Sequence, residues 1–77
     1  MKHFEITYHI LNHSFTCKCS TIYEAAQTLY DIGTHDPRAF DVSEIDKYIE
    51  TLMSLKDGHL LSHVSHHFSI KYVEGEV

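Results

Sequence analysis

Hydrophobic and polar residues alternate along two neighbouring segments near the start of the chain. Every second position of residues 4–10 and 15–19 is apolar, and these positions are Phe4, Ile6, Tyr8, Ile10, Phe15, Cys17 and Cys19. Alternation with a period of two is typical of strands that bury one face. The pattern predicts a β-hairpin. With Asn12 and His13 as a two-residue turn, Tyr8 would lie opposite Cys17, so that apolar side chains meet across the strands.

A first helix is expected directly after the hairpin. Thr21 and Glu24 have the spacing of a capping box, in which the threonine hydroxyl accepts from the glutamate amide. The apolar residues that follow have helical spacing, and they are Ile22, Ala25, Ala26, Leu29 and Ile32. Gly33 is expected to end this helix in a left-handed conformation.

A second helix start is predicted at Asp41, with Phe40 and Ile45 as the apolar pair of a hydrophobic staple. Its apolar stripe consists of Val42, Ile45, Ile49, Leu52 and Met53. The helix is expected to end at Gly58.

The period returns to two after Leu60, which predicts one further strand. Its apolar face would hold Val64, His66, Phe68, Ile70 and Tyr72, and its polar face His63, Ser65, His67, Ser69 and Lys71. The element order is then ββααβ. We expect an α+β fold in which two helices pack on one face of a three-stranded, mainly antiparallel sheet and the other face is open.

The size of the chain favours one small domain over residues 1–77. A hydrophobic content of 43% argues against disorder. The N-terminus has no apolar signal core, and no apolar run approaches the roughly 20 residues of a membrane span. We therefore expect a cytoplasmic protein that does not contact a membrane.

Acidic residues are concentrated in the predicted helical part. Residues 21–58 hold eight acidic and three basic side chains, a net charge of −5, which is the formal net charge of the whole chain. An acidic surface of this kind could meet a basic partner, or it could be an ordinary solvated surface. The candidate partner-binding residues are Glu24, Asp31, Asp36, Glu44, Asp46, Glu50 and Asp57.

Eight histidines are the most unusual feature of the composition. On the open sheet face, His9, His63, His67 and Glu5 are the candidate metal ligands, although two histidines four residues apart in a strand are separated by roughly 13 Å. The alternative is a solvated polar face. The Cys17–Cys19 pair could supply thiolates, but its positions also suit core packing. We expect no cofactor.

The sequence has no loop-borne nucleophile, oxyanion-forming glycine turn or phosphate-cradling loop, so we expect a non-enzyme. Direct nucleic-acid binding is not expected, because the polar sheet face offers only Lys18 and Lys71 and the strand aromatics are predicted to point into the core.

The leading hypothesis is an acidic protein-interaction module, such as a phage or mobile-element inhibitor or regulator that binds the basic, nucleic-acid-handling surface of a partner. One alternative is a histidine-dependent protein that binds a metal or a small ligand. Another is a homodimer or larger oligomer of structural character, paired through a strand edge.

Overall fold

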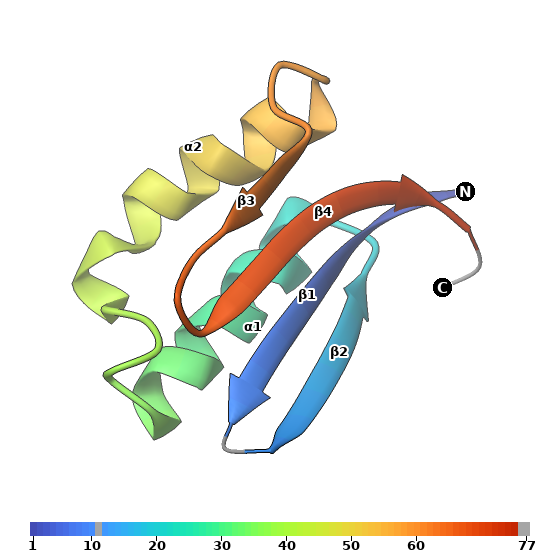
Figure 1. The fold of residues 1–77 in the computed structure, drawn as a ribbon. Helices are drawn as coiled ribbons and strands as arrows, with labels where there is room; N and C mark the ends of the chain where they lie inside the picture. Colours follow the sequence, from blue (N-terminus) through green and yellow to red (C-terminus); the bar gives the residue numbers. More distant parts are fainter. Residues whose placement is uncertain (11, 76–77) are drawn as a thin grey trace.

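Two helices pack on one face of an antiparallel sheet in the computed structural model, which describes residues 1–10 and 12–75 (Figure 1). The elements are β1 (Lys2–Ile10), β2 (His13–Cys19), α1 (Ile22–His35), the 3-10 turn η1 (Val42–Glu44), α2 (Ile45–Lys56), β3 (Ser62–Val64) and β4 (Phe68–Glu74). The predicted α+β class is confirmed. The sheet, however, has four strands in the order β2-β1-β4-β3, so the prediction of three strands is wrong.

The fourth strand arises because the segment after Leu60 is a hairpin and not one strand. The chain reverses after Ser65, whose amide and hydroxyl both donate to the carbonyl of Phe68, at 2.9 and 3.1 Å. Val64 and His66 are therefore exposed, and neither lies on the core face as predicted. The turn contains no glycine or proline, so its sequence gives no signal of the reversal.

The β1–β2 hairpin forms as predicted, but its register differs by two residues. Tyr8 lies opposite Phe15, and Ile6 lies opposite Cys17. His13 is already a strand residue, paired with Ile10, so the predicted Asn12–His13 turn is wrong. A shift of two residues keeps each side chain on its face, so apolar residues still meet.

The first helix begins at its predicted cap, whereas the cap predicted for the second helix lies at a 3-10 turn before it. Glu24 donates its amide to the Thr21 hydroxyl at 3.1 Å, at the start of α1. Asp41 accepts from the amide of Ser43 at 3.0 Å, but it caps η1, and α2 begins only at Ile45. Gly58 has a φ of 81° and follows the end of α2, as predicted.

Gly33 does not end α1, which continues for two more residues to His35. It is a buried helical residue that lets the chain before α2 approach α1 closely. An added Cβ would lie 2.6 Å from the Phe40 carbonyl oxygen and 2.7 Å from Val42 Cγ1. The predicted left-handed cap is therefore wrong, and the glycine serves helix packing.

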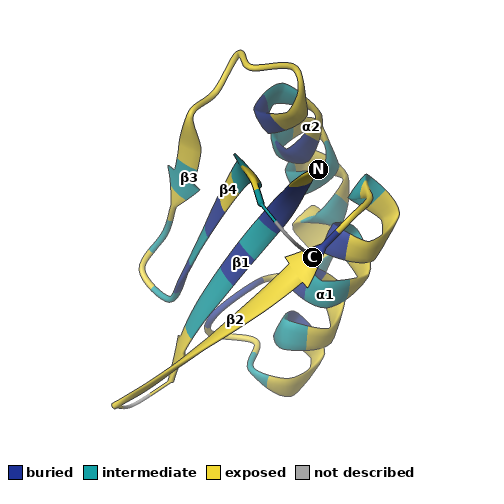
Figure 2. Cartoon of the chain, turned by 90° about the vertical axis from the view of Figure 1, so that its right-hand side faces the viewer, coloured by how far each residue is buried: buried dark blue, intermediate teal, exposed yellow. Residues whose placement is uncertain are grey.

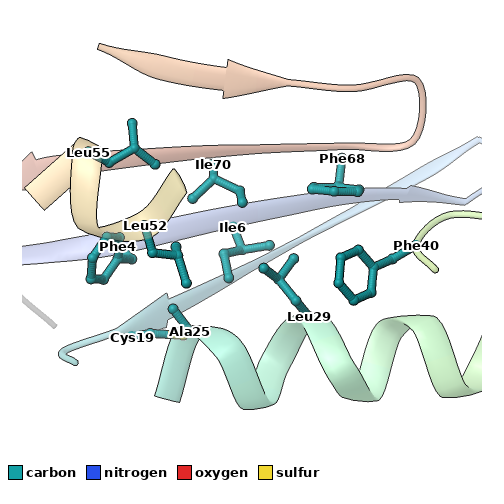
Figure 3. Close-up of a cluster of buried hydrophobic side chains, with 10 residues drawn as sticks. All are labelled: Phe4, Ile6, Cys19, Ala25, Leu29, Phe40, Leu52, Leu55, Phe68 and Ile70. Atoms are coloured by element: carbon teal, nitrogen blue, oxygen red, sulfur yellow. The ribbon is translucent and has the colours of Figure 1, made fainter. Parts of the chain in front are cut away.

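The core lies between the helices and the sheet (Figure 3). Its buried members are Phe4, Ile6, Cys19, Ala25, Leu29, Phe40, Leu52, Leu55, Phe68 and Ile70. Burial of one large apolar side chain stabilises a fold by about 1.5–3 kcal/mol. Cys19 fills the core as expected, whereas Cys17 is exposed because β2 is an edge strand (Figure 2).

Candidate interaction surface

The outward sides of α1 and α2 carry most of the predicted acidic residues. The two helices lie side by side over the sheet (Figure 1). We call five exposed acids on or beside these helices the acidic helical surface: Glu24, Asp31, Asp46, Glu50 and Asp57. None of the five forms an ion pair with any residue in the described part of the chain. Their charges are therefore available to a partner.

Exposed apolar side chains lie among these acids. Tyr23 is 77% exposed, and Tyr30 and Met53 are about half exposed. The two tyrosines are seven residues apart and share one side of α1 with Gly33, the residue against which Val42 packs. They therefore point toward the α2 side of the helical layer.

Met53 reaches the same region from α2. The opposite flank of α2 presents Lys47, Thr51 and Ser54, which line a hollow of about 320 Å³ together with Glu50, His59 and Leu60. Helical periodicity places Met53 on the flank away from that hollow, toward α1. Aromatic residues and methionine are enriched at the centres of protein interfaces, with polar residues around them. Together with the exposed tyrosines and Met53, the acidic helical surface has this composition, and the number of acidic residues alone does not reveal it.

Two of the predicted partner-binding acids are already engaged within the fold. Glu44 lies 3.7 Å from the ammonium group of Lys47. Asp36 accepts a hydrogen bond of 2.6 Å from the Tyr8 hydroxyl and one of 3.2 Å from the amide of Arg38. Its side chain is only 15% exposed. Asp36 therefore joins β1 to the end of α1 and is not part of the acidic helical surface.

The Tyr8–Asp36 hydrogen bond changes the acidity of both groups. It lowers the pKa of Asp36, and Arg38 adds to this effect. It also raises the pKa of Tyr8, as does burial. The unfolded chain therefore binds a proton at Asp36 at higher pH than the folded chain does.

We expect Tyr8→Phe to reduce stability near neutral pH and to flatten its decline in acid. The Asp36 carboxylate stabilises the fold above the unfolded aspartate pKa of about 3.9, and this contribution is lost as pH falls through the lower folded-state pKa. Urea denaturation at a series of pH values from neutral to about 2 measures the profile. The variant and the original protein should converge at the acidic end.

Tyr23→Phe is the matched control, because the Tyr23 side chain is exposed and its hydroxyl forms no hydrogen bond with residues 1–10 and 12–75. Its acid profile should follow that of the unmodified protein. An unchanged profile in Tyr8→Phe would show that the Tyr8–Asp36 hydrogen bond contributes nothing in solution.

The four candidate metal ligands are not brought together. His63 lies on the helix-facing side of the sheet, where its ring centroid is 5.3 Å from that of Tyr48. His9 and His67 meet at one end of β1, and the amide of His9 donates to the His67 carbonyl at 2.8 Å. Glu5 is farther along β1, 3.6 Å from Lys71. Within residues 1–10 and 12–75, no three His, Cys, Asp or Glu side chains are grouped to hold a metal ion.

His3 is buried although it lies on the face of β1 that carries polar residues. It lies on the side expected to be solvated, yet its side chain is 1% exposed. Nε2 is 3.1 Å from Glu5 Oε2, and a Cβ on Gly75 would lie 3.1 Å from Cε1. The segment after β4 therefore covers one end of this face, a contact between chain ends that no local pattern encodes.

Neither helix in the described part of the chain is long and apolar enough to cross a membrane. Comparison of the chain with family models, curated proteins and solved structures finds no match in any of the three.

Proposed function

We propose that this chain is a non-enzymatic interaction module whose acidic helical surface binds a basic surface of a partner protein. The observation that carries the proposal is the group of five exposed acids, without ion pairs among the described residues, around Tyr23, Tyr30 and Met53. Charged side chains at the rim would steer a basic partner into contact. The exposed aromatic and methionine side chains would supply the contact area at the centre.

The partner class follows from the charge. Proteins that handle nucleic acids present basic clefts or patches to bind phosphate groups. A protein that covers such a patch excludes the nucleic acid, so the module would act as an inhibitor or regulator, in the cytoplasm where these proteins work. Small inhibitors of this kind suit a phage or another mobile element.

We expect Glu50→Lys to weaken partner binding by at least about tenfold, because it replaces attraction by repulsion within the contact. Affinity capture from the source cell identifies the partner, and titration calorimetry with the purified partner then measures both variants. Glu74→Lys is the matched control. Glu74 is exposed on β4 beside the N-terminal amine, and its replacement changes the net charge by the same amount.

Salt provides the second test. Binding through exposed charges should weaken steeply between low and moderate ionic strength, because screening shortens the reach of the field to about 8 Å at physiological salt. Equal losses of affinity in Glu50→Lys and Glu74→Lys, or an affinity indifferent to salt, would contradict the proposed contact surface.

A further inference from the structure

At the β2 edge of the sheet, the outward backbone groups of Ser14 and Thr16 form no hydrogen bond with residues 1–10 and 12–75. His9 donates its amide to His67 on the β4 side, so the even-numbered residues of β1 direct their groups toward β2. Their partners in β2 include Phe15 and Cys17. The intervening Ser14 and Thr16 therefore direct their amides and carbonyls outward, away from the sheet, and Figure 1 shows this edge uncovered.

This edge lacks the usual protection against strand pairing. Edge strands are commonly blocked by a proline, a bulge, a short length or a central charge. The β1–β2 register is unbroken over all seven residues of β2, which contains no proline. Its one lysine, Lys18, lies near the end of the strand and not at its centre. By contrast, the other edge strand, β3, has only three residues.

Phe15 adds an apolar side chain at the centre of the open edge. It projects from the same side of the sheet as the core residues, but it is 56% exposed. The expectation that the strand aromatics point into the core is therefore wrong for Phe15. Its exposed ring and the outward backbone of its two neighbours form one surface suited to a strand.

We propose that β2 pairs antiparallel with β2 of a second copy, about a two-fold axis at Phe15. Ser14 then lies opposite Thr16 of the second copy, and their outward groups form reciprocal hydrogen bonds. The two Phe15 rings become a close cross-strand pair, which is a favourable aromatic contact.

The proposed strand pair itself brings no like charges against each other. The sequence of β2 contains no acidic residue, and the net charge of −5 is carried by residues 21–58. In the proposed register Lys18 faces Asn12, and no two like charges oppose each other. The product is a continuous sheet with both helical layers on one face, which would present two acidic helical surfaces side by side. The inference does not depend on the proposed function.

Sedimentation velocity over a wide concentration range, from micromolar upward, tests the pairing. The unmodified protein should change from the mass of one chain to that of two. Thr16→Pro should remain a single chain, because it removes an outward amide without removing a β1 hydrogen bond. Thr16→Val is the control, since it loses the hydroxyl that lies 3.2 Å from Thr7 Oγ1 but keeps the amide.

A second variant keeps the test valid if Thr16→Pro does not fold. Circular dichroism reports whether Thr16→Pro folds, and Phe15→Lys should also abolish the dimer by placing like charges at the axis. A single-chain mass for the unmodified protein at every concentration would overturn the proposal. Dimers that persist in a folded Thr16→Pro and in Phe15→Lys would overturn it too.

Disulfide trapping tests the register. Phe15→Cys combined with Cys17→Ser should form a covalent dimer under mild oxidation, because directly opposed residues of a non-hydrogen-bonded pair have Cβ atoms close enough for a disulfide. Cys19 is buried and should not react. Efficient cross-linking of the unmodified protein through Cys17 instead would overturn the axis at Phe15.

Discussion

Phe68→Ala is expected to lower the free energy of unfolding by about 3–5 kcal/mol, the usual cost of removing a buried phenylalanine ring. Phe68 is 1% exposed and lies at the start of β4. Its ring centroid is 5.8 Å from that of Tyr48 on α2 and 6.1 Å from that of Phe40. The variant therefore leaves a cavity where the β3–β4 hairpin meets the helical layer. Urea denaturation followed by circular dichroism measures the loss.

Tyr23→Ala is the control for the Phe68 result. It removes a ring of similar size from an exposed position on α1, so stability should change by no more than about 0.5 kcal/mol. Equal losses in the two variants would show that β4 does not bury Phe68 against the helices.

Gly33→Ala should be the second most damaging of these substitutions, at about 1–3 kcal/mol. Helix propensity alone predicts the opposite, because alanine is favoured over glycine inside a helix by about 1 kcal/mol. The new methyl group, however, would lie 2.6 Å from the carbonyl oxygen of Phe40, and a backbone atom cannot move aside cheaply. The denaturation midpoint decides between the two effects.

Gly58→Ala separates conformational strain from crowding. An added Cβ at Gly58 meets no atom within 4 Å, but its φ of 81° disfavours any side chain. We expect a cost of about 1–2 kcal/mol from the left-handed conformation. If Gly33→Ala instead stabilised the protein, the close approach between α1 and the segment before α2 would be wrong.

Local patterns predict the parts of this fold that local physics determines. Thr21 caps α1 because a hydroxyl three residues before an amide needs no tertiary contact to bind it. The alternation in residues 4–10 identifies the buried face of β1, since that face follows from strand geometry alone.

Features that depend on distant contacts could not be predicted in the same way. The two-residue shift between Tyr8 and its partner leaves every side chain on the same face, so the hydrophobic pattern allows both registers. A glycine at position 33 suits either a left-handed helix end or a close contact between two segments. Only the position of Phe40 in the structure shows that the second role applies. The reversal after Ser65 contains no glycine, proline, asparagine or aspartate that would indicate a turn.

The candidate interaction surface also combines features that local patterns predict with features that depend on distant contacts. Exposure of Asp46 and Glu50 follows from their position opposite the apolar stripe of α2. The engagement of Asp36 depends on Tyr8, which is 28 residues earlier in the chain. Tyr23 and Tyr30 could have been found from the sequence, because they fall outside the apolar stripe of α1 defined by Ala25 and Leu29.

The central position of β1 has a consequence for how the chain acquires its structure. β1 pairs on one side with β2, its immediate successor, and on the other with β4, where Lys2 lies opposite Glu74. During synthesis, β1 is therefore made long before β4, and the β1 edge that pairs with β4 has no hydrogen-bond partner until β4 has been made. Sequence-distant pairings of this kind slow folding and expose intermediates to aggregation. A ribosome-bound chain truncated after α2 should remain protease-sensitive even though both helices and the first hairpin have been made.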